Sequence, residues 1–471
     1  MVFSSMLFLW IFLPAVLILY WLFGDRFRNR AGNVILLVAS LFFYAWGEPV
    51  YIFLLLFSVV LNYVFALLIA KSHPKLFLFL DIAANILLIG YFKYYAFFAT
   101  CLNKLLPGDP IPMKEIGLPI GISFYTFQAM SYVIDVYRKE VEPQRNFGKV
   151  LLYISLFPQL IAGPIVRYKD IAQQIDSREN TWEKRSYGIR RFVYGLAKKV
   201  LLANFFAYYA DRIFTLDLLQ VGCSLEWLKM LFYTLQIYYD FSGYSDMAIG
   251  LGSMFGFDLK ENFNYPYISR SLREYWTRWH ISLSTWFKEY VYIPLGGSRK
   301  GTARTCINLL VIFFLTGLWH GASMHFVAWG MFYGVLLVIE RLFLRKALDA
   351  LPKHHLGFLG NLYIWIATIV AFTFFREESI GDALHTLRIM FSFKEYGISA
   401  IQCLTPAIVV MLVLGILLSG FLQMWFPKFK AFLYRREVPK AWETVLMFGL
   451  LFLCMMRLVS DSYNAFIYFR F

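Results

Sequence analysis

The stretch YIFLLLFSVVLNYVFALLIA, from Tyr51 to Ala70, has twenty residues and no charged side chain. A helix of this length rises about 30 Å, which matches the hydrocarbon core of a bilayer. Similar apolar runs cover Met6–Phe23, Leu76–Gly90 and Ala407–Trp425, and each is bounded by charged residues, Pro or Gly. Repeated runs of this kind predict a polytopic membrane protein that lies in the lipid bilayer.

The composition of the whole chain supports this class. Of the 471 residues, 59% are hydrophobic and 16% are charged, whereas a soluble domain is nearer half apolar and about a quarter charged. A soluble enzyme is therefore excluded, and we predict an all-α polytopic membrane protein with roughly 11–13 transmembrane or re-entrant helices. Further candidate spans are Val34–Trp46, Leu118–Val136, Phe192–Phe214, Trp227–Leu251, Ile307–Trp319, Phe326–Leu344, Tyr363–Phe375 and Val445–Leu458.

The charges between these runs predict the topology. The first run lacks a charged leader and a small-residue cleavage site, so we expect a retained helix with its N-terminus outside. The acidic or neutral turns at Glu48 and around Asp217 then fall outside as well. The positive-inside rule assigns the basic segments to the cytoplasm: these are Lys71–Lys75, Arg138–Lys149, the long loop Arg167–Arg191, and Arg270–Arg304.

One apolar segment is interrupted, and nothing divides the chain into soluble domains. Leu151–Val166 contains Pro158 and an Ala-Gly-Pro triplet, which break helices, and we interpret it as re-entrant. Without repeats or low-complexity tracts, residues 1–471 are predicted to form a single membrane domain. The net charge of +15 is attributed to cytoplasmic loops facing anionic lipid. No basic, aromatic-interleaved stretch suggests a nucleic-acid partner.

The five cysteines do not predict a metal or redox site. They are scattered singly, without the paired spacing that zinc ligands or a redox motif would need. The predicted metal content is therefore none, and the cysteines are expected to be small packing residues. They are Cys101, Cys223, Cys306, Cys403 and Cys454.

Two of the seven histidines lie in an apolar segment, LTGLWHGASMHFVAWG, from Leu315 to Gly330. Ionisable groups inside a membrane are costly and by default mark a site. On one helix His320 and His325, five residues apart, would point about 140° away from each other, so they do not form a ligand pair. Gly317 and Gly321 flank His320 and allow close approach of backbone or substrate. For His325 we favour a hydrogen-bonded histidine at a helix start.

A further histidine, His280, lies in RSLREYWTRWHISLSTWFKEYVYIPLGG, from Arg270 to Gly297. Plotted as one helix, this stretch has too many charges to span a membrane and too strong an apolar face for a loose loop. It fits an interfacial or partly inserted helix, with a plain membrane-surface anchor as the alternative. The predicted apolar face is Trp276, Trp279, Leu283, Phe287 and Tyr290, and the opposite face is Glu274, Arg278, Thr285, Lys288 and Glu289.

The runs REYWTRWHISLSTWFKEYVYIPLGGSR (Arg273–Arg299) and LTGLWHG (Leu315–Gly321) resemble the bacterial branch of the membrane-bound O-acyltransferase (MBOAT) family, specifically the alginate O-acetylation protein I family. Further blocks that resemble it are LFFYAWGEP (Leu41–Pro49), LPIGISFYTFQAMSYVIDVYR (Leu118–Arg138), FPQLIAGPIVRY (Phe157–Tyr168), YYDFSGYSDMAIG (Tyr238–Gly250) and FIYFRF (Phe466–Phe471). The resemblance implies a fold with a central tunnel or funnel and a catalytic core at about 118–345. It assigns His320 as the catalytic histidine and His280 as the second motif histidine.

The resemblance also implies acyl transfer from a thioester, with acetyl-CoA as the expected co-substrate and no bound cofactor, to a polysaccharide hydroxyl. It implies a bacterial inner-membrane location and a separate extracytoplasmic SGNH or esterase-like acetyltransferase partner. A hydroxyl nucleophile needs a base near neutral pH, and a buried imidazole stays in the uncharged form that can accept a proton. Candidate oxyanion donors next to His320 are Trp319, Ser323 and backbone N–H groups.

Polar residues inside other apolar runs are candidates for the substrate path. Asp240 and Asp246 lie in YYDFSGYSDMAIG, where buried acids need partners or water. The sequence leaves open whether they line a site or make structural contacts between helices. Trp276, beside His280 on the helical plot, is a further candidate for donor binding.

Other functions remain open at this point. One is a transporter or flippase component that moves an acyl group or a lipid-linked sugar without catalysis, although the two halves show no matching interrupted helices. Another is D-alanyl transfer to teichoic acid from a carrier-protein thioester. The acceptor is also open, because alginate, another exopolysaccharide, cellulose and peptidoglycan all present sugar hydroxyls.

Overall fold

The computed structural model describes residues 1–24, 29–108, 110–216, 221–395 and 397–460. Within these ranges the chain is helical, and the only β pairing is one isolated bridge between Val221 and Ile398. The predicted outer turn around Asp217 and the terminal block Phe466–Phe471 lie outside the described residues. The all-α prediction is confirmed.

The chain forms two compact units that interleave along the sequence. Unit 1 comprises Met1–Val193, Tyr244–Glu261 and Arg436–Met447, and unit 2 comprises Tyr194–Gly243, Asn262–Arg435 and Phe448–Phe471. Helices α10 (Trp182–Ala197), α12 (Cys223–Met254) and α24 (Ala441–Ser460) contribute residues to both. The prediction of a single membrane domain over residues 1–471 stays a prediction.

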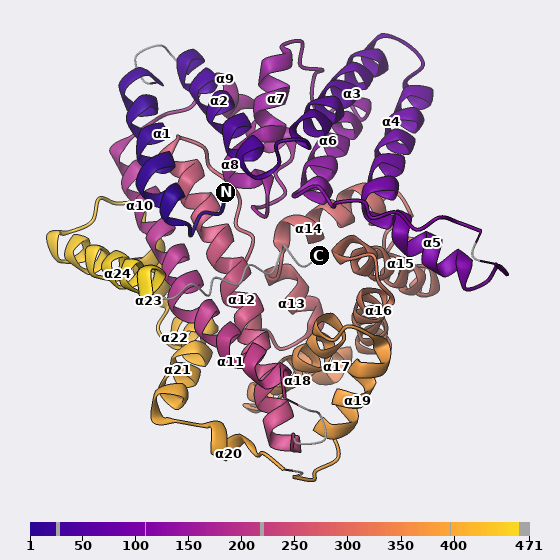
Figure 1. Cartoon of the computed structure of the whole chain (residues 1–471), viewed down its shortest axis with the longest axis vertical. Helices are drawn as coiled ribbons and strands as arrows, with labels where there is room; N and C mark the ends of the chain where they lie inside the picture. The colour runs from indigo at the N-terminus through magenta and orange to yellow at the C-terminus, as the bar shows by residue number, and fades with distance from the viewer. Residues whose placement is uncertain (25–28, 109, 217–220, 396, 461–471) are drawn as a thin grey trace. The chain divides into compact units, whose positions relative to one another are not determined.

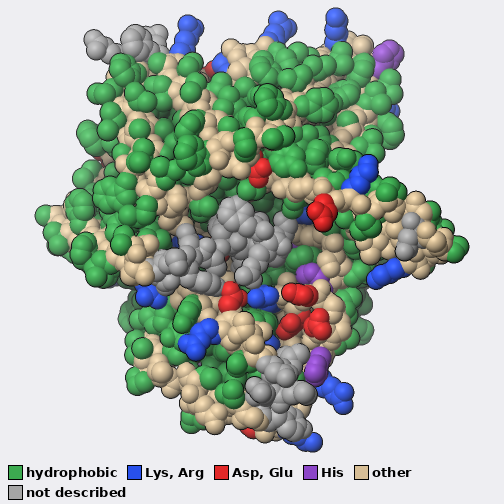
Figure 2. Space-filling view, in the orientation of Figure 1, with side chains coloured by type: hydrophobic (Ala, Val, Ile, Leu, Met, Phe, Trp, Pro, Cys, Tyr) green, Lys and Arg blue, Asp and Glu red, His purple; other side chains and the backbone are tan. Residues whose placement is uncertain are grey.

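Unit 1 is built around α3, α4 and α6, which lie side by side (Figure 1). Figure 2 shows apolar side chains over the helices of this unit and Lys and Arg side chains at their upper ends in that view. The helices of unit 1 are η1 (Phe8–Phe12), α1 (Leu13–Leu19), η2 (Tyr20–Gly24), α2 (Arg30–Gly47), α3 (Ile52–Lys71), α4 (Pro74–Ile89), η3 (Gly90–Tyr94), α5 (Tyr95–Asn103), α6 (Ile122–Tyr137), α7 (Phe147–Ser155), α8 (Phe157–Leu160) and α9 (Tyr168–Asp176).

Unit 2 contains the antiparallel neighbours α15 and α16, and α16 also packs on α18. Its helices are η4 (Lys198–Ala203), α11 (Asn204–Phe214), η6 (Pro266–Ile268), α13 (Leu272–Arg278), α14 (Ile281–Phe287), η7 (Lys288–Tyr292), α15 (Thr302–His320), α16 (Met324–Ile339), η8 (Glu340–Leu344), α17 (Arg345–Ala350), η9 (Leu351–His354), α18 (Gly357–Arg376), α19 (Ile380–Met390), α20 (Ala400–Cys403), α21 (Pro406–Ile416), η10 (Leu417–Phe421), α22 (Leu422–Trp425) and α23 (Pro427–Tyr434).

Eight helices in the described ranges are long and apolar enough to cross a membrane: Arg30–Gly47, Ile52–Lys71, Pro74–Asn103, Thr302–His320, Met324–Ala350, Gly357–Arg376, Pro406–Trp425 and Ala441–Ser460. The other predicted spans are helical too, but they are shorter or carry charges. Phe8–Gly24 is a shorter apolar helix, α6 has 16 residues, and α12 contains buried Glu226, Lys229, Asp240 and Asp246. The chain is a multi-pass membrane protein.

The predicted interruption of Leu151–Val166 is present. Helix α7 ends at Ser155, α8 begins at Phe157 with Pro158 in its first turn, and the chain after Leu160 leaves the helix through the Ala-Gly-Pro triplet. Proline suits a first turn because its missing N–H would have no helical partner there. All of these residues are buried, so the break lies inside unit 1.

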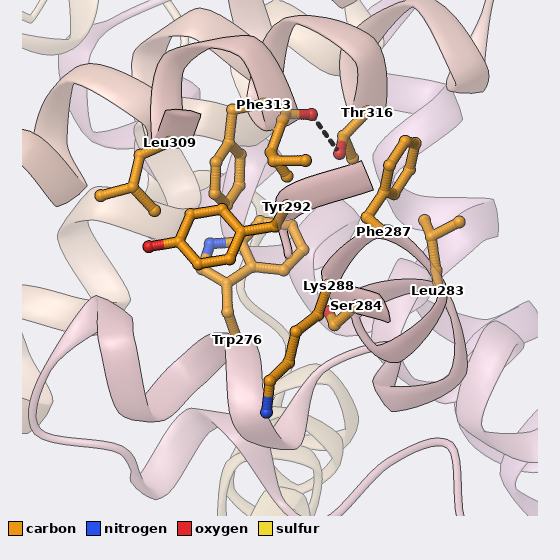
Figure 3. Close-up of a pocket in the computed structure, with 10 residues that line it drawn as sticks. Trp276, Leu283, Ser284, Phe287, Lys288, Tyr292, Leu309, Phe313 and Thr316 are labelled. Atoms are coloured by element: carbon orange, nitrogen blue, oxygen red, sulfur yellow. Dashed lines mark hydrogen bonds between the residues drawn. The ribbon is translucent and has the colours of Figure 1, made fainter. Parts of the chain in front are cut away.

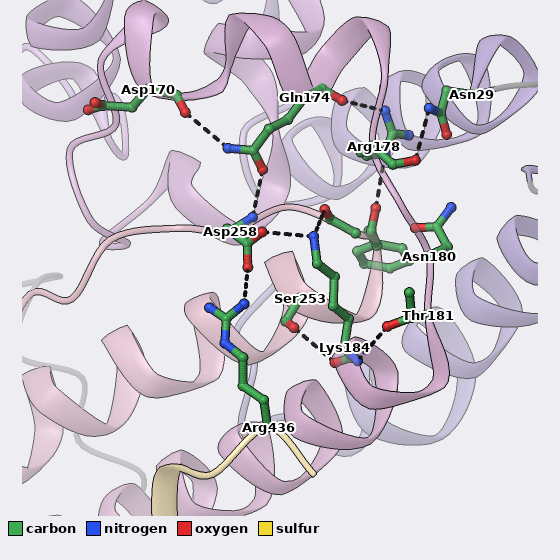
Figure 4. Close-up of polar contacts among 12 residues, drawn as sticks. Asn29, Asp170, Gln174, Arg178, Asn180, Thr181, Lys184, Ser253, Asp258 and Arg436 are labelled. Atoms are coloured by element: carbon green, nitrogen blue, oxygen red, sulfur yellow. Dashed lines mark hydrogen bonds and ion pairs between the residues drawn. The ribbon is translucent and has the colours of Figure 1, made fainter. Parts of the chain in front are cut away.

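The predicted long loop Arg167–Arg191 is wrong in its structure, because α9 and the start of α10 occupy it. Polar contacts hold these helices to the end of α12, as Figure 4 shows. The Gln174 side chain accepts from the backbone N–H of Asp258 at 2.7 Å, and the Asp258 carboxylate pairs with Lys184 at 2.7 Å and Arg436 at 2.9 Å. The charges that predicted a loop are therefore used in tertiary contacts.

The predicted continuous helix through Arg270–Gly297 is also wrong. It is divided into α13 and α14 by Trp279 and His280, and His280 has a left-handed backbone with φ 43°. The loop before α13 supplies the hydrogen bonds that a continuous helix would have made. Asn262 O accepts from the Ile281 N–H, and the Asn264 N–H donates to Arg278 O, both at 2.9 Å.

The predicted apolar face is mostly buried in protein instead of lying at a membrane surface. Trp279, Leu283, Phe287 and Tyr290 are all buried, and Trp276 is half-buried. The membrane-surface anchor is therefore not their role. This segment is part of the core of unit 2.

Candidate active site

His320 is the last residue of α15, and close helix packing positions it. A Cβ added at Gly317 would lie 2.4 Å from the carbonyl oxygen of Phe326, and one at Gly321 would lie 2.1 Å from the Phe326 ring. At Gly317 only glycine permits this approach of backbone, so the predicted close approach is confirmed there, whereas Gly321 makes room for the Phe326 ring. Because α15 ends at His320 and α16 begins at Met324, His320 and His325 belong to different helices.

Three aromatic rings surround the His320 imidazole, which is 8% exposed. The ring centres of Trp319, Trp329 and Phe375 lie 4.9, 4.8 and 5.2 Å from it, each nearly perpendicular to the imidazole. The imidazole is thus packed almost entirely against apolar ring surfaces.

His280 is buried next to Asn262 and aromatic rings. Its Nδ1 lies 3.2 Å from the Asn262 side-chain oxygen, and Phe241 packs edge-on at 4.7 Å between ring centres. His280 lies outside the eight candidate spans, and burial lowers the pKa of its imidazole to about 3. His280 is thus neutral at physiological pH.

The indole of Trp319 contacts both histidines. Its ring centre lies 5.8 Å from that of His280 and 4.9 Å from that of His320. The two histidines, forty residues apart in sequence, therefore contact the same tryptophan. The structure brings together these three predicted site residues.

A cavity of about 270 Å³ lies close to this group, and Figure 3 shows the side chains that line it. Trp276 forms one wall and packs against Phe313 and Trp329, at 4.9 and 6.1 Å between ring centres, and Trp329 in turn packs on His320. The lining is mostly apolar, with one lysine and the hydroxyls of Ser284, Tyr292 and Thr316. The residues are Trp276, Leu283, Ser284, Phe287, Lys288, Tyr292, Leu309, Ile312, Phe313 and Thr316.

The two predicted acids make buried ion pairs. Asp240 pairs with Lys199 at 2.8 Å in unit 2, and Asp246 pairs with Arg191 at 2.6 Å in unit 1. All four side chains are nearly inaccessible. These pairs fit the structural alternative, in which the acids join helices. Asp246 belongs to a different unit from the histidines.

Two other predictions concern the start of α16. His325 is its second residue and contacts the Phe374 carbonyl oxygen through Nδ1 at 3.1 Å, so the hydrogen-bonded histidine at a helix start is confirmed. Ser323 is the residue before the helix and is half-buried. Within the described ranges, no three His, Cys, Asp or Glu side chains are grouped so that they could hold a metal ion.

Sequence reasoning missed Trp329, Phe375 and Asn262. The buried indole N–H of Trp329 has no hydrogen-bond acceptor in the described part of the chain. Trp329 lies nine residues beyond His320 in the stretch Leu315–Gly330. An indole N–H, which can only donate, so near a candidate base could have identified Trp329 from the sequence. Phe375 and Asn262 are ordinary residues of distant segments, and only the fold brings them to the histidines.

The model of the MBOAT, or membrane-bound O-acyltransferase, family matches residues 138–380, which include both histidines and the cavity. The chain belongs to this family and is an O-acyltransferase.

The chain is also similar to individual proteins with named activities. The chain is 39% identical to a probable alginate O-acetylase, AlgI, of Pseudomonas putida, over the full length of both proteins. It is 34% identical to a peptidoglycan O-acetyltransferase of Helicobacter pylori, over 82% of this chain and 79% of that one. A teichoic acid D-alanyltransferase of Bacillus subtilis is 27% identical over 48% of this chain and 59% of its own length.

Proposed function

We propose that this O-acyltransferase takes an acetyl group from a cytoplasmic thioester, acetyl-CoA, and passes it across the membrane for O-acetylation of a cell-surface or exported polysaccharide. The observation that carries the proposal is the buried His320, held among three aromatic rings at the end of α15. The two O-acetylating relatives, named for alginate and peptidoglycan, support the acetyl group and the polysaccharide acceptor.

Acyl transfer by this route needs two proton transfers, one from the hydroxyl to His320 and one from His320 to the leaving thiolate. A hydroxyl oxygen attacks the thioester carbonyl carbon while His320 accepts the hydroxyl proton. The C–S bond then breaks, and the leaving thiolate takes that proton from the imidazolium. Negative charge on the carbonyl oxygen needs fixed donors in the intermediate state. The indole N–H of Trp329 is a candidate in addition to Trp319 and Ser323, because it is buried close to His320.

We expect the thioester donor to bind in the cavity of about 270 Å³ that Trp276 lines. A second cavity of about 130 Å³ shares Tyr292 and Leu309 with it and is lined by Arg273, Arg341 and Arg345. The same lining includes Glu340 and Asp349, and Asp349 pairs with Arg273 and Arg345 at 3.5 and 3.8 Å, so among the described residues Arg341 is the guanidinium of this cavity without an ion pair to either acid. Guanidinium groups bind phosphate well, whereas the apolar first cavity suits the neutral arm that joins phosphate to thioester. Arg270–Arg304 is predicted to be cytoplasmic, which agrees with a charged donor from that compartment.

The acceptor side would be the polar cavity beyond Phe375. This ring packs on His320, and the next residue, Arg376, lines a cavity of about 520 Å³ with Asp211, Glu377 and Asp382. Polar walls suit a sugar hydroxyl or the acetylated group of a partner. Each cavity is lined by, or adjacent in sequence to, a residue of the aromatic packing that includes His320, which supports the tunnel or funnel implied by the resemblance.

We further propose a bacterial inner membrane as the location and an extracytoplasmic SGNH or esterase-like acetyltransferase as the partner that completes transfer to the polymer. A donor made in the cytoplasm and an acceptor outside require an enzyme in the membrane between them. D-alanyl transfer to teichoic acid is the weaker alternative, because that relative matches only about half of the chain.

Replacing His320 by alanine tests the proposal. Loss of a general base costs roughly 10²- to 10⁴-fold in rate, or about 3 to 5 kcal/mol of barrier. We expect normal protein in the membrane fraction and near-complete loss of O-acetyl groups released by mild base from purified surface polymer.

His325→Ala is the matched control. It also removes a histidine near the end of α15, but this one contacts the Phe374 backbone carbonyl and is not among the rings that surround His320. It should retain most of the acetylation. Normal acetylation in His320→Ala would refute the catalytic assignment and favour a protein that only conducts the acyl group.

A further inference from the structure

The side-chain oxygen of Asn262 is the centre of a small buried network. It accepts the backbone N–H of Ser282 at 3.1 Å and the Ser282 hydroxyl at 2.9 Å, and it lies 3.2 Å from His280 Nδ1. The Asn262 backbone carbonyl accepts the Ile281 N–H. Asn262 is fully buried, so water does not compete for these contacts.

These contacts decide which ring nitrogen of His280 carries the proton. A backbone N–H can only donate, so the Asn262 atom that faces Ser282 N must be the amide oxygen. An oxygen cannot donate to Nδ1, and the contact at 3.2 Å is favourable only if Nδ1 carries a hydrogen. Neutral His280 is therefore the Nδ1–H form, and its lone pair is on Nε2.

The Nε2 atom has no hydrogen-bond partner within the described residues, although His280 is only 1% exposed. The rings of Phe241, Phe263 and Trp319 surround the imidazole. Charged groups on the adjoining segments are paired elsewhere: Asp240 with Lys199, and Arg278 with Glu274. A buried acceptor without a partner is costly, so a site that retains one is suited to a ligand that supplies the donor.

We propose that Asn262 is a positioning residue that fixes His280 as the Nδ1–H tautomer, so that Nε2 accepts a hydrogen bond from a neutral O–H or N–H group of a substrate beside Trp319 and His320. His280 then acts as a hydrogen-bond acceptor, while the proton transfer belongs to His320. This inference rests on the proposed acyl transfer for its kinetic test but not for its structural one.

The structural test is the tautomer itself. In the full-length protein purified in detergent and labelled with ¹⁵N-histidine, the His280 signals are assigned by their loss in His280→Gln. We expect a protonated Nδ1 and an unprotonated Nε2 that moves when substrate is added. A protonated Nε2 in the unmodified protein would overturn the inference whether or not the protein transfers acetyl groups.

The kinetic test uses two substitutions of Asn262. Asn262→Asp keeps an oxygen acceptor for Ser282 and for Nδ1–H, so the tautomer should persist. Its charge raises the pKa of His280, so the acidic limb of the rate profile should move to higher pH, because protonated Nε2 cannot accept a hydrogen bond. Asn262→Leu removes the acceptor and should lower transfer by at least about ten-fold, less than the ~10⁴-fold lost with the orienting aspartate of a protease triad.

Ser282→Ala is the matched control, because it removes one hydrogen bond to the same oxygen and leaves the contact with His280. It should keep the tautomer, the pH profile and most of the activity. An unshifted pH profile in Asn262→Asp, or a loss in Ser282→Ala equal to that in Asn262→Leu, would reduce Asn262 to a structural residue. If His320→Ala stays active while the tautomer is as expected, the proposed function fails and this inference stands.

Discussion

A methyl group added at Gly317 would separate α15 from α16 and so move the two sides of the active site apart. The Cβ of Gly317→Ala would lie 2.4 Å from the Phe326 carbonyl oxygen and 3.2 Å from Val327 Cα, and both are backbone atoms that cannot rotate away. A carbon–oxygen contact normally needs about 3.3 Å, so α16 must move by roughly 1 Å. That shift carries Trp329, on α16, away from His320, on α15.

We expect Gly317→Ala to cost a similar free energy in stability and in the activation barrier, because a 10²-fold loss of rate is about 2.7 kcal/mol. Overpacking of this kind costs about 1–3 kcal/mol, whereas a misplacement of about 1 Å in a reacting geometry can cost 10²-fold in rate. We expect Gly317→Ala to reach the membrane in reduced but measurable amount and to transfer acetyl groups about 10²-fold more slowly per molecule. The assay is O-acetyl release from surface polymer, normalised to the protein in the membrane fraction.

Gly90→Ala is the control, because no heavy atom lies within 4 Å of the added Cβ at that helical glycine. It should behave as the unmodified protein. If Gly317→Ala were equally active per molecule, the site would tolerate the shift of α16, and the argument from close packing would be refuted.

Three further changes test other parts of the structure. Trp329→Phe keeps a ring beside His320 but removes the indole N–H, and an oxyanion-donor role predicts a loss of up to about 10²-fold in transfer rate per folded molecule, beyond the lower thermal stability expected from the smaller buried ring. Asp240→Asn leaves Lys199 buried with a neutral partner. It should lower the melting temperature in detergent, because removal of one charge from a buried pair costs about 3–5 kcal/mol. A melting temperature equal to that of the unmodified protein would refute this. A single cysteine at Arg299 should resist a membrane-impermeant reagent applied to intact cells, and ready labelling would contradict the predicted topology.

The membrane helices could be predicted because each depends on local composition. Ile52–Lys71 carries no charged residue before its last position, and its hydropathy alone explains why it is helical and lies in lipid. The close glycine contacts near His320 were predictable for the same reason, since small residues in an apolar helix are a local signal of helix packing.

The break at His280 could not be predicted, because the hydrogen bonds that replace those of a continuous helix are made with a segment outside Arg270–Gly297. The local pattern of Trp276, Leu283 and Phe287 is that of one amphipathic helix, and the helical plot followed it. Asn262 and Asn264 take up the hydrogen bonds at the break, and nothing in the helical pattern identifies them as partners. Likewise the charges of Arg167–Arg191 indicated a loop. The helical structure there could not be predicted, because Lys184 pairs with Asp258, which lies far along the chain and also pairs with Arg436.

The same glycines that build the membrane fold also determine the catalytic geometry. An added Cβ at Gly330 would lie 2.2 Å from the Phe313 carbonyl oxygen, so α16 approaches α15 through its own glycine as well as through Gly317. Between these two contacts the helix axes are as close as backbones allow, and Trp329, next to Gly330, is pressed against His320. The distance from the base to its neighbouring donor is thus determined by backbone contact, without an adjustable side chain between the helices. This is why His320→Ala should separate activity from stability, whereas Gly317→Ala should lower both.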